Sequence, residues 1–152
     1  MTEHINPVTG EVEDAPAVLE LVPLDLVNLS EEDLLAMFPS PVQVAGALQI
    51  ARARIGHAPA VLKDLSAAVK AAKRDLLIAK GKAYRDARQA GFNITDARLF
   101  SDVDGPVVEA REAVDDAELE LEFGRDLRKS LTTDIDILRS LNANVRAEVH
   151  HA

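Results

Sequence analysis

The sequence predicts an all-α protein built on a long antiparallel, coiled-coil-like helical hairpin, with a short N-terminal helical segment packing at its base. Hydrophobic residues make up 47% of the 152 residues but aromatic residues only 3%, so Leu, Val and Ala must supply the core. This mixture favours closely packed helices over a β-sandwich or barrel. Apolar residues also recur at helical spacing in two long segments, and Pro and Gly stand between the segments.

The first part of the chain divides into a tail and two short helices. Residues 1–28 contain several prolines and many acids, which is typical of a tail without its own core. The helical domain is expected over residues 29–152. Its short helices are predicted over 30–38 and 41–55, because each is preceded by a serine that can cap a helix N-terminus, Ser30 and Ser40.

Two longer helices, over residues 59–90 and 106–148, are predicted to form the hairpin. Their apolar residues recur at alternating steps of three and four, which is the pattern of a coiled-coil seam. Gly91 is placed to end the first of them, and residues 91–105 are expected to form the bend. The predicted seam consists of Leu62, Leu65, Val69, Ala72, Leu76, Ala79, Ala117, Leu121, Gly124 and Leu131.

Folding the chain back about this bend predicts which seam residues face one another. The expected pairs are Ala79 with Ala117, Ala72 with Gly124, and Leu65 with Leu131. The longer last helix needs a further apolar partner at its end, and helix 41–55 is the candidate. A two-helix hairpin buries little apolar surface, so self-association is also expected.

The net charge of −9 is concentrated at the N-terminal end. Residues 1–51 hold nine acids and no Lys or Arg, and the remaining residues hold 17 acids and 17 bases. Within that remainder, residues 52–88 are strongly basic and residues 96–148 strongly acidic. One hairpin helix is therefore expected to complement the other, which selects register more than it stabilises, because exposed ion pairs contribute less than about 1 kcal/mol each.

An apolar stretch interrupts the acidic tail at residues 18–27. Two interpretations are open. The stretch docks on a helical groove or sheet edge of a partner, or it covers part of this protein's own core. The candidate docking residues are Val18, Leu19, Leu21, Val22, Leu24, Leu26 and Val27.

The residue types of most catalytic and metal sites are absent or scattered. The chain has no cysteine, which excludes thiolate metal sites and cysteine nucleophiles. None of its four histidines stands four residues from a carboxylate, the helical spacing of a metal-ligand pair, and its glycines form no phosphate-binding loop. The carboxylates of the last helix, Asp134 and Asp136 among them, are expected on solvated faces. We therefore expect no enzymatic activity, cofactor, metal or small-molecule ligand.

The basic residues of helix 59–90 gather near one broad face and could neutralise phosphates. Only Tyr84 offers an aromatic ring among them for stacking on bases, and the acidic helix would compete. Nucleic acid is therefore a less favoured partner than a protein. The candidate face comprises Lys63, Lys70, Lys73, Arg74, Lys80 and Arg88.

Two stretches of the chain resemble small proteins of phages that infect actinobacteria. Residues 5–12 (INPVTGEV) are similar to the N-terminal leader of many phage early proteins, often proteins of DNA replication or recombination. Residues 104–111 (DGPVVEAR) and 134–148 (DIDILRSLNANVRAE) resemble the ending of a helical-hairpin family common in such genomes. The resemblance covers about the C-terminal two thirds. It implies a phage origin and an early-gene setting, and it implies no activity and no site residues.

These observations predict a non-enzymatic phage adaptor that self-associates and binds a protein partner in DNA replication, recombination or host takeover. Three alternatives stay open: a virion connector or scaffold component, an acidic mimic of nucleic acid, and a nucleic-acid binder. No apolar run approaches the roughly 18 residues that a membrane-spanning helix needs, so no membrane partner is expected. The expected location is the host cytoplasm, with the virion as the alternative.

Overall fold

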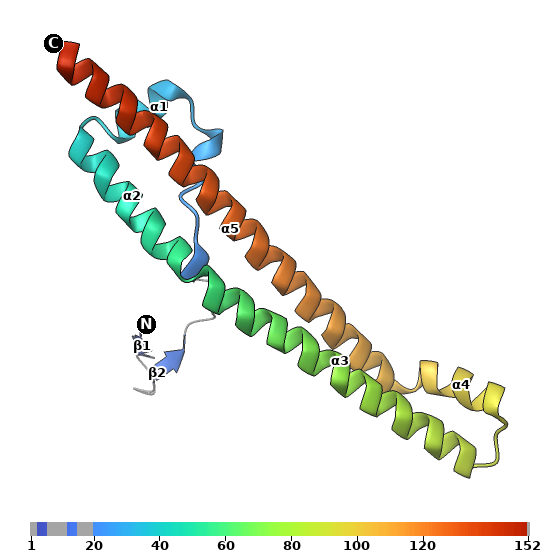
Figure 1. Cartoon of the computed structure of the whole chain (residues 1–152). Helices are drawn as coiled ribbons and strands as arrows, with labels where there is room; N and C mark the ends of the chain where they lie inside the picture. Colours follow the sequence, from blue (N-terminus) through green and yellow to red (C-terminus); the bar gives the residue numbers. More distant parts are fainter. Residues whose placement is uncertain (1–2, 6–11, 15–19, 152) are drawn as a thin grey trace. The chain divides into compact units, whose positions relative to one another are not determined.

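The computed structural model confirms the all-α fold class, and it describes residues 3–5, 12–14 and 20–151. The chain forms two compact units. Unit 1 comprises Met1–Val61 and Gly124–Ala152, and unit 2 comprises Leu62–Phe123. The boundaries between them fall inside two continuous helices, α3 (Ala58–Gln89) and α5 (Gly105–His151) (Figure 1).

A short β-ribbon lies near the N-terminus, in the segment where the sequence indicated only a tail. Strand β1 (Glu3–Ile5) pairs antiparallel with β2 (Val12–Asp14), and His4 stands opposite Glu13. A ribbon of two such short strands adds few hydrogen bonds and is marginally stable on its own. It therefore leaves the helical character of the fold unchanged.

Unit 1 is built around α2 (Pro41–Gly56) and the last part of α5, which run side by side in Figure 1. The short helix α1 (Glu31–Met37) precedes them. Serine caps begin both short helices, as the sequence predicted: Ser30 Oγ accepts the N–H of Asp33, and Ser40 Oγ accepts that of Gln43. The buried core cluster consists of Leu26, Leu34, Val44, Ala47, Leu48, Ala51, Ile135, Leu138, Leu141 and Val145.

Residues 20–29, here called the strap, cross unit 1 as an extended segment that ends in the 3₁₀ helix η2 (Leu26–Asn28). Two polar contacts hold the strap to the C-terminal end of α2. Arg54 Nη1 donates to the carbonyl oxygen of Val22 at 3.0 Å, and His57 Nδ1 lies 3.6 Å from Glu20 Oε2. Leu21 and Leu26 of the strap are fully buried, and Leu26 belongs to the core cluster, so the strap covers part of this protein's own core.

Unit 2 contains the antiparallel parts of α3 and α5 and a third helix, α4 (Ile94–Val103), where the sequence indicated only a bend with a helical turn. Gly91 follows α3 with φ of 97°, a backbone conformation that favours glycine. Asn93 then caps α4, because its Oδ1 accepts the N–H of Asp96 at 2.8 Å.

The hairpin register differs from the predicted one by more than one helical turn. Lys73 Nζ lies 3.3 Å from Glu118 Oε1, whereas the predicted register placed Phe123 opposite Lys73. Ala79 lines a hollow with Pro106, so the expected pairing of Ala79 with Ala117 is wrong. The prediction assumed that the end of α3 meets the start of α5. In fact the last turns of α3 extend past the first residues of α5, and α4 packs beside these turns instead of α5.

The seam residues are buried to different degrees. Leu65 and Val69 are buried in unit 2, and Gly124 and Leu131 are buried in unit 1. The others are half-buried: Leu62, Ala72, Leu76, Ala79, Ala117 and Leu121. Short alanine side chains on two helices cannot cover one another fully, so this stretch of the hairpin is only partly closed to solvent.

Candidate protein-binding surface

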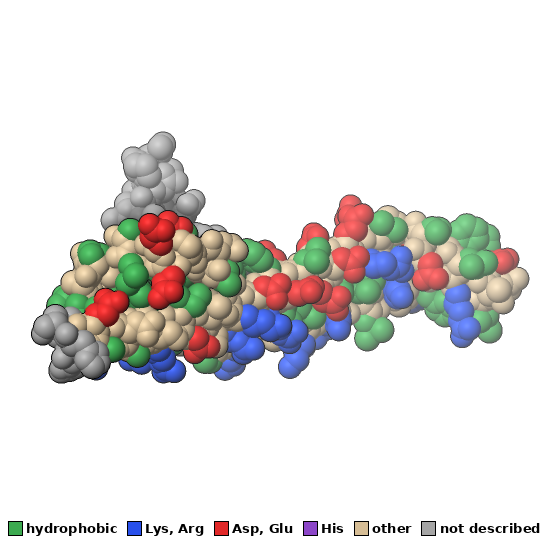
Figure 2. All heavy atoms as spheres, turned by 90° about the horizontal axis from the view of Figure 1, so that it is seen from above, with side chains coloured by type: hydrophobic (Ala, Val, Ile, Leu, Met, Phe, Trp, Pro, Cys, Tyr) green, Lys and Arg blue, Asp and Glu red, His purple; other side chains and the backbone are tan. Residues whose placement is uncertain are grey.

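Helix α4 carries a cluster of exposed apolar side chains, here called the α4 patch. Its members are 39–71% exposed: Phe92, Ile94, Leu99, Phe100 and Val103. The rings of Phe92 and Phe100 pack together with centroids 4.3 Å apart. Four members and the Asp96 carboxylate line an open hollow of about 470 Å³. Hydrophobic side chains gather at the right-hand end of Figure 2, where α4 lies.

The buried face of α4 is made of small residues. Ala97 is fully buried and Ser101 is 7% exposed, while Leu99 and Val103 on the other faces are 63% and 71% exposed. An amphipathic helix of a monomeric protein normally turns its large apolar residues toward the core. Here the small residues let α4 pack closely, and the large ones remain in solvent. A patch of this kind marks a protein interaction site more often than a random surface does.

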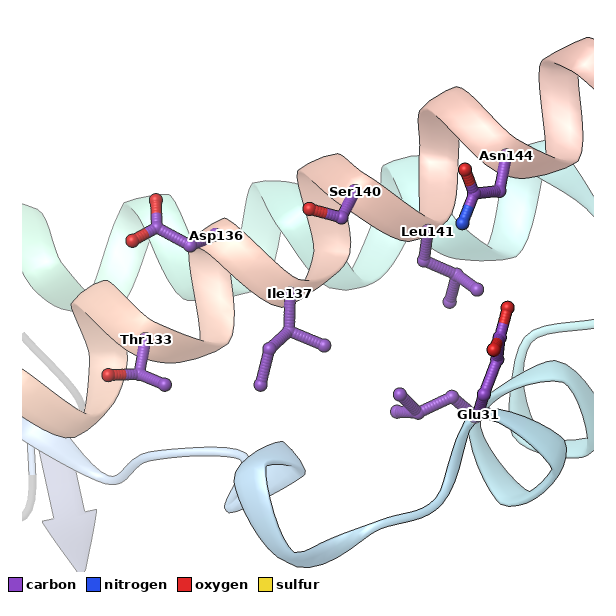
Figure 3. Close-up of a pocket in the computed structure, with 8 residues that line it drawn as sticks. Glu31, Thr133, Asp136, Ile137, Ser140, Leu141 and Asn144 are labelled. Carbon is purple, nitrogen blue, oxygen red and sulfur yellow. The ribbon is translucent and has the colours of Figure 1, made fainter.

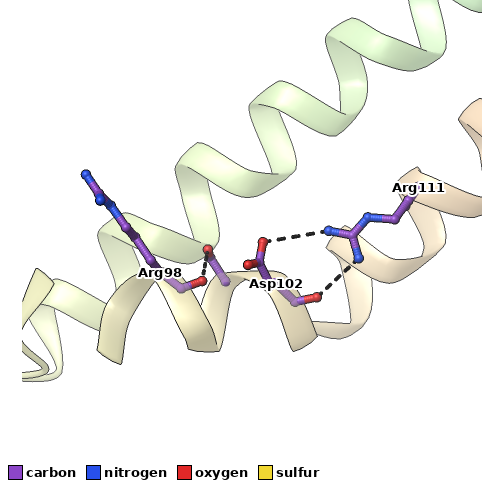
Figure 4. A network of polar contacts seen from close by, with 4 residues as sticks. Arg98, Asp102 and Arg111 are labelled. Carbon is purple, nitrogen blue, oxygen red and sulfur yellow. Dashed lines mark hydrogen bonds and ion pairs between the residues drawn. The ribbon is translucent and has the colours of Figure 1, made fainter. Parts of the chain in front are cut away.

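Helix α4 is held in place from both ends, so the patch is displayed on a fixed element. Asn93 caps its first turn. At the other end, Arg111 of α5 donates from Nη1 to the carbonyl oxygen of Asp102 at 3.4 Å, and its Nη2 lies 3.7 Å from Asp102 Oδ1 (Figure 4). Apolar side chains on a fixed helix lose less conformational freedom on binding than the same side chains on a loop.

The apolar stretch of the tail is largely absorbed by the protein's own core. Leu21 and Leu26 are fully buried, so these two side chains are not accessible to a partner. Leu24 is half-buried and packs against the core cluster. Val22 and Val27 remain exposed, at 42% and 63%. Val18 and Leu19 lie outside the described residues.

The carboxylate of Asp134 was predicted to lie on a solvated face, and this prediction is wrong. Its side chain is only 1% exposed and accepts two backbone N–H groups of the strap. The N–H of Leu24 donates to Oδ2 at 2.7 Å, and the N–H of Leu26 donates to Oδ1 at 3.0 Å. Its burial could have been inferred from helical spacing. Asp134 is three residues after Leu131 and four before Leu138, so it lies on the same face of the helix as these two buried leucines.

A second hollow, of about 390 Å³, lies between α1 and α5 in unit 1. Polar and apolar side chains line it together: Glu31, Leu34, Thr133, Asp136, Ile137, Ser140, Leu141 and Asn144. Figure 3 shows Glu31 pointing toward α5, while Asp136 projects away from α1. The two carboxylates do not converge, so the hollow lacks the paired arrangement of a general acid and base.

The six candidate nucleic-acid residues all lie on α3 but do not share one role. Lys73 forms the ion pair with Glu118, and Lys80, one heptad further on, is half-buried. Arg88 donates to the carbonyl oxygen of Phe92 at 3.1 Å and so helps to end α3. Arg88 and the other three candidates are exposed on the outward face of α3: Lys63, Lys70, Arg74 and Arg88. Arg85 is also exposed on this face, although it is not one of the six candidates.

Metal-binding and membrane-spanning features are limited in the described residues. Over residues 3–5, 12–14 and 20–151, no three His, Asp or Glu side chains are grouped so that they could hold a metal ion.

In the same part of the chain, no single helix is both long and apolar enough to cross a membrane. One bent pair meets that criterion only when its two parts are counted together across a 97° bend. The parts are α1 (Glu31–Met37) and the combined segment Pro41–Gln89, which contains α2 and α3.

Comparisons with protein-family models, with curated proteins and with solved structures found no match to this chain. The resemblance to phage proteins therefore stays a prediction. The function has to be argued from the surface of the molecule, and the α4 patch is its most distinctive feature.

Proposed function

We propose that this chain is a non-enzymatic adaptor that binds a protein partner through the α4 patch. One observation carries the proposal: α4 buries Ala97 and Ser101 and leaves Leu99, Phe100 and Val103 in solvent. Exposed leucine, valine and phenylalanine side chains gain about 1.5–3 kcal/mol each when they are fully buried. A complementary partner would supply that burial.

A protein suits this surface better than a nucleic acid does. The hollow of the patch is lined by four apolar side chains and one carboxylate, so a phosphate backbone would find no cation there. Two packed phenylalanine rings offer a partner the kind of aromatic anchor that dominates protein interfaces. An apolar helix or strand with a polar rim is the partner chemistry that fits.

The biological setting is proposed from the resemblance alone. A phage early protein would meet its partner in the host cytoplasm, among proteins of DNA replication, recombination or host takeover. The chemistry of the α4 patch would suit a partner encoded by the host or by the phage.

A matched pair of variants tests the proposal. Leu99→Asp with Val103→Asp places charge in the patch, and Val42→Asp makes the same change at an 80% exposed valine on α2. Tagged protein would be captured from nuclease-treated host cells and its partners quantified by mass spectrometry. The proposal expects one protein captured by the parent chain and by Val42→Asp, and at least about tenfold less with the patch variant.

Two outcomes would contradict this function. In the first, the parent and patch variants capture the same proteins in equal amounts. In the second, the parent chain captures only copies of itself, and this self-capture is also lost with the patch variant. The α4 patch would then be a self-association surface, and the adaptor proposal would fail.

A further inference from the structure

The face of α3 that points away from its seam is a basic stripe. Its members are exposed and recur at helical spacing: Lys63, Lys70, Arg74, Arg85 and Arg88. The buried residues Leu65 and Val69 lie on the opposite side of the same helix. The acids of this part of α3, such as Asp64 and Asp75, fall outside the stripe by helical spacing.

The hairpin does not neutralise this stripe. Among the described residues, a single ion pair joins α3 to α5, between Lys73 and Glu118. The expectation that one helix complements the other is therefore met by one contact at the edge of the seam. Most of the basic charge of α3 faces solvent.

The centre of the basic stripe is apolar. Leu77 and Ile78 are 72% and 62% exposed, and they lie between Arg74 and Arg85 along the helix. An apolar centre with a charged rim is the usual layout of a protein interface. It is unusual for a nucleic-acid surface, where apolar residues in line with the cations would face phosphates.

The face of α5 that points away from the seam in unit 2 carries the opposite charge and exposed apolar residues of its own. Its exposed acids recur at helical spacing: Glu109, Glu112, Asp116 and Glu120. Leu119 and Phe123, at the C-terminal end of this row, are 63% and 55% exposed. The buried residues Val107 and Val114 lie on the seam side. In the middle of Figure 2 a row of acidic side chains lies above a row of basic ones.

The two outward faces are complementary in charge and in their exposed apolar residues. Leu77 and Ile78 lie within the basic stripe, and Leu119 and Phe123 lie at the C-terminal end of the acidic row. Each face can therefore offer the other both opposite charge and a pair of apolar side chains. The two faces point in opposite directions from one hairpin.

We propose that the outward face of α3 docks on the outward face of α5 of a second copy of this chain. Leu77 and Ile78 would pack against Leu119 and Phe123, with the arginines beside the carboxylates. Because the two faces lie on opposite sides of unit 2, the contact is heterologous. Each copy keeps one free face, so the assembly grows into an open chain or closes into a ring. This inference involves no residue of the α4 patch and stands or falls separately from the adaptor function.

Sedimentation of the full chain at low and high salt tests this inference. Two double variants remove one face each: Arg74→Glu with Arg85→Glu for the basic face, and Glu112→Lys with Asp116→Lys for the acidic face. Arg52→Glu, at an exposed position of α2, is the control for a charge reversal elsewhere. Circular dichroism would establish that each variant is as helical as the parent.

The proposal expects the parent and Arg52→Glu to form species larger than a dimer that dissociate as salt increases. Each double variant alone should associate roughly tenfold more weakly or worse, because like charges then meet at the contact. An equimolar mixture of the two double variants should recover association, since each supplies the face that the other lacks.

Three results would overturn the inference. The parent chain could sediment as a monomer at every concentration and salt tested. The mixture of double variants could fail to recover association although both variants are folded. Nuclease treatment could abolish the larger species, and the basic face would then belong to a nucleic acid.

Discussion

The carboxylate of Asp134 accepts the backbone N–H of Leu26 at 3.0 Å, and the two residues stand 108 positions apart in the sequence. The same carboxylate accepts the N–H of Leu24 at 2.7 Å. This clamp fixes the strap to α5 and allows Leu21 and Leu26 to be fully buried. Part of the acidic tail is thereby converted into a structural element of unit 1.

The clamp predicts a large effect of Asp134→Ala. Removing the acceptor leaves two strap N–H groups without a partner, so the free energy of unfolding should fall by roughly 2–4 kcal/mol. Asp134→Asn keeps one acceptor oxygen and should lose about half as much. Urea denaturation measures both. Asp136→Ala, at an exposed residue two positions further along α5, should stay within about 0.5 kcal/mol of the parent. Equal values for the two alanine variants would contradict the clamp.

The bend at Asp25 gives a second prediction. Asp25 has φ of 55° and ψ of 43°, and it stands between the two residues that donate to Asp134. Glycine adopts this left-handed conformation freely, so Asp25→Gly should change the free energy of unfolding by less than about 1 kcal/mol. A β-branched side chain resists it, so Asp25→Val should cost about 1–2 kcal/mol more than the glycine variant. Equal thermal stability of the two variants would mean that the bend is not left-handed.

The observed hairpin register can be measured by cross-linking, because the chain contains no cysteine. Lys73→Cys with Glu118→Cys should react rapidly with a short bifunctional thiol reagent, since these side chains meet in the structure. Lys73→Cys with Glu122→Cys, one helical turn further along the same face of α5 and close to the register predicted from the sequence, should react several-fold more slowly. Faster reaction of the second pair would restore the predicted register.

The close packing of α4 predicts a large loss of stability for one substitution and almost none for a neighbouring one. Ala97 is fully buried, so Ala97→Leu should cost about 1–3 kcal/mol through overpacking. Leu99 is 63% exposed, so Leu99→Ala should change stability by less than about 0.5 kcal/mol. Thermal unfolding of both variants tests this. A larger loss for Leu99→Ala would mean that its side chain belongs to the core.

The helices and their caps could be predicted because their causes are local. Ser30 and Ser40 stand where N-caps are needed, and Gly91 stands where the chain adopts positive φ. The packing of α2 against the end of α5 was also predictable, since Ile135 and Leu138 needed an apolar partner beyond the reach of the hairpin.

The register and the candidate site could not be predicted, because both depend on contacts between distant residues. Alanine-rich seams fit one another at several offsets, so periodicity alone did not fix the pairing of Lys73 with Glu118. The sequence predicted only a bend over residues 91–105, and no local pattern says that Ala97 faces inward and Leu99 outward. For Asp134, residue type suggested solvent and spacing suggested the core, and the strap N–H groups decided in favour of the core.

Photo-cross-linking from the α4 patch tests the central claim most directly. A photoreactive amino acid would replace Val103, and a matched chain would carry it in place of Val42, which is exposed on α2. After irradiation in the native host, the adaptor account predicts one discrete cross-linked protein from position 103 and none of it from position 42. The same adducts from both positions, or adducts only between copies of this chain, would contradict the account.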